Sequence, residues 1–299
     1  MNKVYTLLLS DLYLDAIKNK EKKLSLIHGE SFSDILKIAS SRWIEYIPEK
    51  RDTYSVGIDS SWNKKSYQGI DLFVIDSVAV TSFNQILSTR WNYGVNTVSG
   101  GSLSSEAMIM EIDLSSLVMV DMDEKPDILC VDGSIISNML HNKSSRYANK
   151  VQSLIQKNNR DSLILFISKN SNTKNQFKEH GAKAADIYYF NKLGSNPGFS
   201  LPNINTNPNL SGVLDVVEVY VRLSPFVPLI KIEIINNLSI SEKEIQNIMD
   251  RLCYHSINGY PYCLRLAHKS CKVANVDVKR IASVYGLKNE FGARDSLNE

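Results

Sequence analysis

The sequence lacks any apolar run that could cross a membrane. No segment of its 299 residues approaches the ~18 consecutive apolar residues of a membrane helix. The short apolar run from Val4 to Leu9 is followed by the acidic Asp11 and Asp15, and no small-residue cleavage site comes after it. We therefore expect a soluble, cytoplasmic protein with no membrane partner.

Cysteine is also scarce, with four residues and no CxxC pair. Without that spacing, the sequence does not predict a zinc site, and a reducing cytosol disfavours a disulfide. Cys130 lies within an apolar segment and is interpreted as a small core residue.

No excess of one charge marks the chain, since 34 basic residues face 32 acidic ones and the net charge is +2. A nucleic-acid-binding protein usually carries a clear basic excess, so DNA binding would require local clustering of the basic residues. Hydrophobic residues at 43% and charged residues at 22% are near globular averages, which excludes wholesale disorder.

Helical spacing dominates the beginning of the chain, in two stretches between residues 4 and 47. In the second stretch apolar residues recur at three- and four-residue steps from Phe32 to Ile47, and Pro48 stops the pattern. We interpret residues 1–50 as an N-terminal helical extension and residues 51–299 as the functional domain.

The elements that follow predict a fold class. The expected order is a strand at 54–59, a turn at 62–69, strands at 70–80 and 86–93, a Ser/Gly-rich segment at 99–105, a helix at 106–120, a strand at 128–132, a helix at 135–157 and a strand at 162–168. Three antiparallel strands followed by helix-connected strands is the order of the ribonuclease H-like fold. We therefore expect an α/β protein with a mixed sheet flanked by helices.

The remaining third of the chain is less regular. A loop of more than twenty residues is expected at 191–212, followed by strands at 213–223 and 227–234. Ser241 and Glu244 form a capping-box pattern that predicts a helix over 241–254.

Two apolar segments each end in an aspartate, Asp59 and Asp132. Carboxylates are the ligands that Mg²⁺ and Mn²⁺ prefer, and a bridging carboxylate can hold two ions about 4 Å apart. The alternative is a purely structural role, in which a strand-end aspartate caps the following turn, as the sequence after Asp132 would allow. If the metal interpretation holds, the two aspartates lie on adjacent strands, close enough to share a cation.

Glu111 and Glu106 are the candidates for a third carboxylate. They lie five residues apart, so they point in different directions from one helix and do not both serve one site. Glu111 stands among apolar residues, where a carboxylate is costly unless it is paired or bound to metal. We therefore prefer Glu111 and leave Glu106 open.

The most distinctive local sequence is Gly259-Tyr260-Pro261, with His268 following at the eighth position after Tyr260. Proline opens helices, so a helix is expected to carry His268 about two turns inside. A neutral imidazole suits Mn²⁺ better than Mg²⁺, or it serves as an acid–base group. A histidine on an apolar helix is alternatively a core residue.

Together these residues resemble the NurA nuclease family. The resemblance rests on the strand ending at Asp59, the Glu111 helix, Asp132-Gly133-Ser134, Ile167-Ser168-Lys169, and the Tyr260-Pro261 element with His268, and it covers about residues 50–275. It implies a ribonuclease H-like, PIWI-like fold and a Mn²⁺-dependent 5′–3′ exonuclease on single- and double-stranded DNA, with single-strand endonuclease activity.

The resemblance also implies partners and residue roles. NurA proteins form homodimers and act in DNA-end resection with a HerA-type hexameric helicase, and a single-stranded DNA-binding protein is a further expected partner. Carried over, Asp59, Glu111, Asp132 and His268 are metal ligands of a two-metal site, with Mn²⁺ expected and Mg²⁺ the alternative. Tyr260 supports the catalytic geometry. Ser60-Ser61 stands where the family commonly has Gly-Ser, and the arginine often found before the family glutamate is not evident.

Three further residues are predicted to contact substrate. Lys169 follows an apolar strand and can meet a phosphate as a point charge. Trp62 and Lys64, expected in the turn beside Asp59, combine stacking with positive charge, as single-stranded DNA binding requires. The alternatives without a function are that Lys169 is a solvated lysine at a strand end, and that Trp62 and Lys64 lie at an exposed hairpin tip.

The sequence leaves two other functions open. The chain could be a catalytically inactive dimeric adaptor or DNA clamp for the translocase. It could also be another ribonuclease H-like nuclease, one that acts on RNA.

Overall fold

The computed structural model of the chain describes residues 2–67, 69–97, 102–141, 145–158, 162–205, 214–235 and 237–287. Part of the expected Ser/Gly segment at 99–105, residues 206–212 of the expected loop, and the start of the expected strand at 213 lie outside these ranges. No helix in the described ranges is long and apolar enough to span a membrane.

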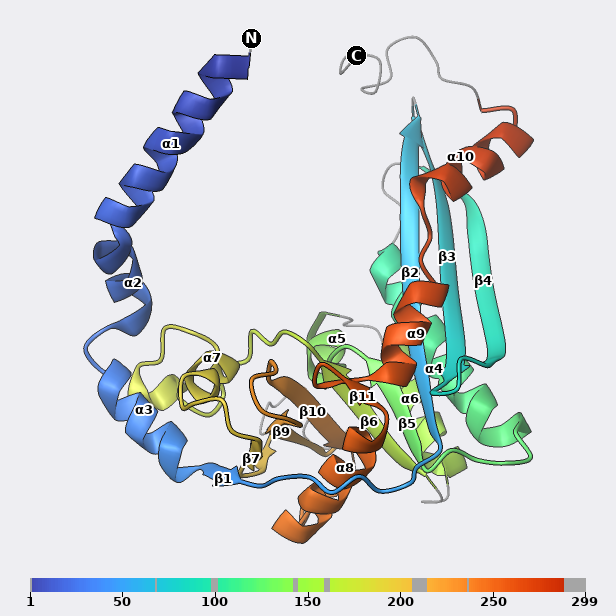
Figure 1. Cartoon of the computed structure of the whole chain (residues 1–299). Helices are drawn as coiled ribbons and strands as arrows, with labels where there is room; N and C mark the ends of the chain where they lie inside the picture. The colour runs from blue at the N-terminus through green and yellow to red at the C-terminus, as the bar shows by residue number, and fades with distance from the viewer. Residues whose placement is uncertain are drawn as a thin grey trace.

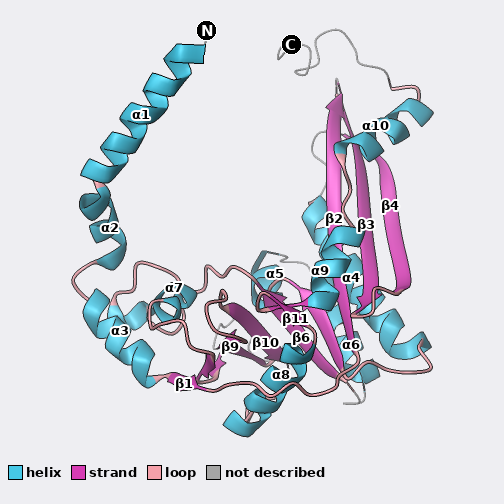
Figure 2. Ribbon diagram, viewed as in Figure 1, coloured by secondary structure: helices cyan, strands magenta, loops and turns pink. Residues whose placement is uncertain are grey.

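The chain is built on one large mixed sheet (Figures 1 and 2). Its strands are β1 (Trp43–Glu45), β2 (Ser55–Tyr67), β3 (Ile70–Thr81), β4 (Ile86–Thr97), β5 (Ile128–Asp132), β6 (Leu163–Ser168), β7 (Gly198–Ser200), β8 (Asn203–Ile204), β9 (Val216–Arg222) and β10 (Ile230–Ile235). The order across the sheet is β1-β7-β9-β10-β6-β5-β2-β3-β4, and β8 pairs with β9.

The pairing directions confirm the predicted fold class. Strands β2, β3 and β4 are antiparallel neighbours, whereas β5 joins β2 in parallel and β6 joins β5 in parallel. Three antiparallel strands with parallel strands added beside the first is the ribonuclease H-like arrangement. Strands β10, β9, β7 and β1 extend the sheet beyond β6 with antiparallel pairs.

Helices cover both faces of the sheet. The helices of the described residues are α1 (Asn2–Lys18), α2 (Lys20–His28), α3 (Phe32–Ser41), α4 (Leu103–Asp121), α5 (Ile135–His141), α6 (Ser145–Asn158), α7 (Asp186–Asn191), α8 (Glu242–Tyr254), α9 (Tyr262–Ser270) and α10 (Asn275–Val284), of which α1 and α2 extend away from the sheet (Figure 1). A short 3₁₀ turn, Lys178–His180, precedes α7, and a two-stranded hairpin of β11 (Ser256–Ile257) and β12 (Tyr260–Pro261) precedes α9.

The alternation along β5 divides the core between two layers. Leu129 and Val131 pack with α4 and α6 on one face, while Ile128 and Cys130 pack with α8 and α9 on the other. A strand buried on both faces is apolar throughout, which explains why β5 was recognisable from its sequence. Cys130 is fully buried, as predicted.

Several predicted boundaries are wrong, and each has a local reason. The helix expected to reach Ile47 ends at Ser41, because residues 43–45 pair with β7 instead. The expected turn at 62–69 is strand as far as Tyr67: β2 and β3 form a long ribbon whose exposed, polar residues were misread as a turn. The expected structureless loop at 191–212 contains β7 and β8.

The expected helix at 135–157 is described as α5 and α6, with residues 142–144 between them outside the described ranges. The helix at 241–254 is confirmed. Ser241 Oγ accepts the Glu244 backbone N–H, and Glu244 reaches back to the Ser241 N–H.

Candidate active site

The two aspartates lie on adjacent parallel strands, as predicted. The register pairs Gly57 with Cys130 and Ile58 with Val131, so one step further brings Asp59 opposite Asp132. Asp132 ends β5, but Asp59 does not end its strand, because β2 continues to Tyr67. Asp59 instead marks the point where the parallel neighbour of β2 stops.

The carboxylate of Glu111 reaches the same place from helix α4. Glu111 lies on α4, is 6% exposed, and accepts a short hydrogen bond from the hydroxyl of Ser60. Glu106 on the same helix forms an ion pair with Arg146 at 3.0 Å instead. The structure therefore brings Glu111, and not Glu106, beside the aspartates.

Helix α9 and the hairpin before it supply the remaining predicted residues. His268 Nδ1 lies 2.8 Å from Asp59 Oδ2, and the Tyr260 hydroxyl donates to Asp132 Oδ1 at 2.5 Å. The His268 side chain is 64% exposed, so it is not a core histidine. All five predicted catalytic residues thus gather at one place.

Gly57 explains how α9 comes so close to β2. A Cβ atom at this position would lie 2.4 Å from the carbonyl carbon of Cys263 and 2.5 Å from the Leu264 nitrogen. Only glycine permits this approach of helix backbone to strand. The hairpin turn that presents Tyr260 has Asn258 at φ 53° and Gly259 at φ 74°, the left-handed pair of a type I′ turn.

Burial and mutual repulsion shape the electrostatics of the site. Burial raises the pKa of Asp59 to about 6, the charge of Asp132 adds to the rise, and the His268 hydrogen bond opposes it. Burial raises the pKa of Glu111 well above its ordinary value, against the effect of the Ser60 hydroxyl and with that of Asp59 and Asp132. Three facing carboxylates of this kind are stabilised as anions by a cation between them.

The donor set fits a hard divalent metal ion, although no ready-made group of three His, Cys, Asp or Glu ligands occurs in the part of the chain that the structure describes. Each carboxylate now holds a hydrogen bond from Ser60, Tyr260 or His268. Carboxylate oxygens with one imidazole are ligands that suit Mn²⁺.

The predicted substrate residues divide into two groups. Lys169 lies beside the site, with its Nζ 4.3 Å from the centre of the Tyr260 ring. Trp62 and Lys64 are not in a turn but on β2, where alternation places them on the face opposite to Asp59. Lys64 forms an ion pair with Asp71 at 2.7 Å.

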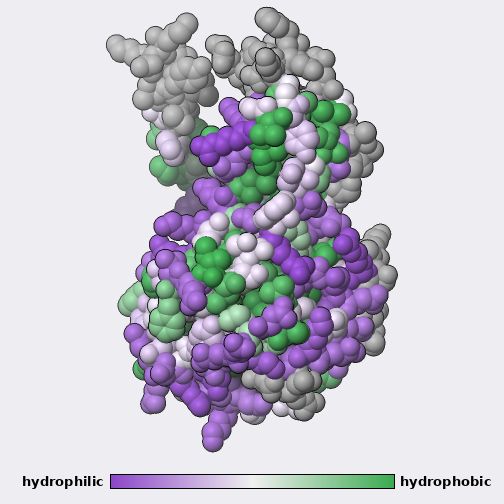
Figure 3. All heavy atoms as spheres, turned by 90° about the vertical axis from the view of Figure 1, so that its right-hand side faces the viewer, coloured by the Kyte–Doolittle hydropathy of each residue, from purple (hydrophilic) through white to green (hydrophobic). Residues whose placement is uncertain are grey.

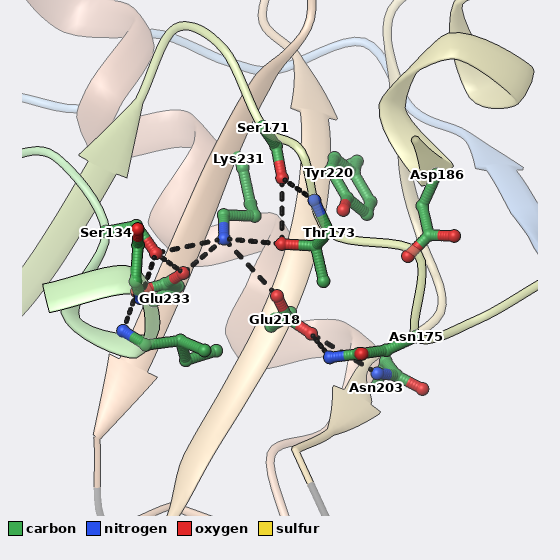
Figure 4. A network of polar contacts seen from close by, with 12 residues as sticks. Ser134, Ser171, Thr173, Asn175, Asp186, Asn203, Glu218, Tyr220, Lys231 and Glu233 are labelled. Atoms are coloured by element: carbon green, nitrogen blue, oxygen red, sulfur yellow. Dashed lines mark hydrogen bonds and ion pairs between the residues drawn. The ribbon is translucent and has the colours of Figure 1, made fainter. Parts of the chain in front are cut away.

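Sequence reasoning missed several polar residues behind the site. Glu218 on β9, with Lys231 and Glu233 on β10, is buried beneath the Asp132 turn (Figure 4). The available signal was the presence of charged residues within otherwise apolar strands, because such residues are rarely buried unless they are paired. The sequence marks Ser60 only as a departure from the Gly-Ser that the family commonly has at this position, and its contact with Glu111 was not predicted.

The sheet order and the carboxylate cluster together define a protein of the ribonuclease H-like class. A model of the NurA domain family matches residues 55–273. The chain belongs to the NurA family.

Comparisons with individual proteins agree with this assignment. The chain is 25% identical to a DNA double-strand break repair nuclease NurA of Sulfolobus acidocaldarius, across 93% of this chain and 96% of that protein. The fold matches a crystal structure of the NurA nuclease from Sulfolobus solfataricus with a TM-score of 0.76 at 20% identity, covering 92% and 96% of the two chains. A crystal structure of NurA bound to dAMP and manganese matches with a TM-score of 0.57 at 10% identity, covering 97% of each chain.

Proposed function

We propose that the chain is a metal-dependent deoxyribonuclease that hydrolyses phosphodiester bonds in DNA double-strand break repair. The observation that carries the proposal is the meeting of Asp59, Glu111 and Asp132 at one point of a ribonuclease H-like sheet. Family membership supports it, since relatives of the chain bear the name of a DNA double-strand break repair nuclease.

The proposed metal is Mn²⁺ in a two-metal site, with Mg²⁺ as the alternative. Similar NurA crystal structures contain manganese, one of them with dAMP. Asp59, Glu111, Asp132 and His268 would hold the ions. When bound, the ions supply an activated water and stabilise charge on the leaving oxygen.

The residues of the chain perform the other tasks. Tyr260 holds the Asp132 carboxylate through its hydroxyl and lies under the Lys169 ammonium, which is placed to meet a DNA phosphate. Hydrogen bonding of His268 Nδ1 to Asp59 leaves the other ring nitrogen to bind an ion or to move a proton. Trp62 and Lys64 would contact DNA further along the β2–β3 ribbon.

The finer activities and partners follow from the resemblance alone. They are 5′–3′ exonuclease action on single- and double-stranded DNA, single-strand endonuclease action, and work in end resection with a HerA-type helicase and a single-stranded DNA-binding protein. We assign the nuclease to residues 51–299 and an accessory extension to residues 1–50.

A homodimer is part of the same proposal. The edge strand β4 exposes Ile86, Trp91 and Val95, and apolar residues lie among polar ones in the upper part of the face seen in Figure 3. Apolar side chains exposed on a sheet edge suit a contact with a second copy.

A cleavage assay tests the proposed function. Wild-type protein, Asp59→Asn and Asp132→Asn are incubated with end-labelled single-stranded DNA over a Mn²⁺ titration. Both variants should lose more than the roughly 10–100-fold that follows removal of a group that merely orients a ligand. The substitutions keep the shape of the side chain, so melting temperatures should stay near that of the wild type.

Other outcomes separate the alternatives. Full Mn²⁺-dependent cleavage by either variant contradicts the proposed site. Wild-type protein that binds DNA without cutting it is an adaptor or clamp, and cleavage of matched RNA in preference to DNA indicates an RNA-directed enzyme.

A further inference from the structure

A buried ionic network lies behind the turn that follows Asp132 (Figure 4). Lys231 on β10 is 1% exposed, while Glu218 and Glu233 are 0% exposed. Lys231 Nζ forms ion pairs with both glutamates, at 3.3 Å from Glu218 Oε1. Buried charges are costly to desolvate, so stability alone does not explain why these charged residues lie in two apolar strands.

One arm of the network holds the Asp132 turn. Ser134 Oγ donates to Glu233 Oε1 at 2.5 Å and accepts from Lys231 Nζ at 3.2 Å. Glu233 Oε2 also accepts the backbone N–H of Ile136 at 3.2 Å. Ser134 and Ile136, the first and third residues after Gly133, are thus tied to a charge that cannot move into solvent.

A second arm holds the segment that follows β6. Lys231 Nζ donates to Thr173 Oγ1 at 3.3 Å, and Ser171 Oγ donates to the same oxygen at 3.0 Å. This segment begins with Lys169. Asp132, Ser134, Lys169, Thr173 and Lys231 all line one cavity of about 980 Å³.

We propose that Lys231, held by Glu218 and Glu233, is a positioning residue that fixes the Asp132 turn and the Lys169 segment relative to each other. The inference rests on the proposed function. It assigns no chemical step to Lys231, which acts through Ser134 on the metal-binding carboxylate and through Thr173 on the phosphate-binding segment. The two arms therefore have separable effects.

Substitution of Lys231 itself is a poor test, because it would leave two buried carboxylates without a cation to pair with and unfold the sheet. Ser134→Ala cuts only the first arm. Groups that orient a metal ligand typically change metal affinity or activity by roughly 10–100-fold. We expect Ser134→Ala to bind Mn²⁺ about 10-fold more weakly, measured on the protein without DNA by electron paramagnetic resonance of free Mn²⁺.

Thr173→Val cuts the second arm with little change of shape. It should raise KM for single-stranded DNA and leave Mn²⁺ affinity unchanged. Ser134→Thr retains the hydroxyl and should restore Mn²⁺ binding to near the wild-type value.

Ser200→Ala is the matched control. Ser200 is fully buried on β7, and its Oγ accepts the Tyr220 backbone N–H at 3.0 Å, so the substitution removes one buried hydroxyl and one backbone hydrogen bond away from the turn. It should lower the melting temperature about as much as Ser134→Ala does while leaving Mn²⁺ affinity and kcat unchanged.

Three results would overturn the inference. If the wild type cleaves DNA and Ser134→Ala binds Mn²⁺ as tightly as the wild type does, the positioning role is wrong but the proposed function stands. Equal weakening by Ser134→Ala and Ser200→Ala shows a general loss of structure instead. A wild-type chain that neither binds Mn²⁺ nor cuts DNA contradicts the proposed function, and the inference falls with it.

Discussion

At the scale of single residues, the site depends on two consecutive positions that face opposite sides of β2. Asp59 points to the α9 layer and pairs with His268, whereas the Ser60 hydroxyl meets Glu111 from the α4 layer. Alternation along a strand is what allows neighbouring residues to serve two layers. The serine at position 60 therefore provides a contact that a glycine there could not make.

Asp186, a buried acid away from the site, leads to a prediction about pH. Asp186 begins α7 and is 0% exposed, and its Oδ2 accepts the Gln176 backbone N–H at 3.1 Å. Burial raises the pKa of Asp186 to about 7. Since this value lies above the unfolded value of 3.8, the native state binds more protons between about pH 4 and 7, and stability is lost as the pH rises through that window.

Asp186→Asn should remove this loss, because the amide keeps an oxygen for Gln176 and carries no charge. The variant should melt at a higher temperature than the wild type at about pH 8 and show no such gain at about pH 4. Thermal unfolding at the two pH values measures the difference. An equal rise in melting temperature at both pH values would show that the Asp186 carboxyl stays charged throughout this pH range.

The residue scale also shows what the sequence could and could not reveal. Asp59, Asp132, Tyr260 and His268 were recognisable because they follow apolar segments or stand in a distinctive element, and the structure brings them together. The choice of Glu111 followed from its apolar neighbours. Lys231 and its glutamates could not be placed, because their partnership depends on the pairing of β9 with β10 and on the β5 turn, which are far apart in sequence.

At the scale of elements, the site depends on the close packing of α9 on β2. Gly57 allows the helix backbone to approach, and the β11–β12 hairpin sets the direction in which α9 begins. His268 and Tyr260 are therefore positioned by one contact between elements.

Gly57→Ala tests this contact. A Cβ there would press on the α9 backbone at 2.4 Å, so the helix must shift and carry His268 away from Asp59. Overpacking of this kind typically costs about 1–3 kcal/mol, which should appear as a lower free energy of unfolding with a fall in nuclease activity.

Gly94→Ala is the control for this change, because it also places alanine at a strand glycine. Its Cβ would meet only the Phe73 ring, at 3.2 Å, and side chains can move aside. Its activity should stay near that of the wild type. A Gly57→Ala enzyme as stable and active as Gly94→Ala would show that α9 is not fixed by this contact.

Sequence reasoning succeeded for elements that are buried on both faces or capped, such as β5 and α8. It failed where an element is stabilised by a distant partner. Residues 43–45 have helical spacing but pair with β7, and the outer half of β2 is polar but pairs with β3. Tertiary pairing overrides local pattern at both places.

At the scale of the whole molecule, the site joins elements that are distant in the sequence but adjacent in the sheet. Strands β2 and β5 and helices α4 and α9 converge, whereas α1 and α2 extend away from the sheet on the other side of Figure 1. The order of the core strands was predictable from their sequence. The antiparallel extension β10-β9-β7-β1 was not, because its pairings are set by long-range contacts.

The central claim is that Asp59, Glu111, Asp132 and His268 form one metal site. A crystal of the wild-type protein soaked in Mn²⁺, with anomalous diffraction measured at the manganese edge, tests it most directly. We expect anomalous density between Asp59 and Asp132, with Glu111 and His268 in contact with the metal and Glu106 still paired with Arg146. Density at another place, or bound by Glu106 in place of Glu111, would contradict the claim.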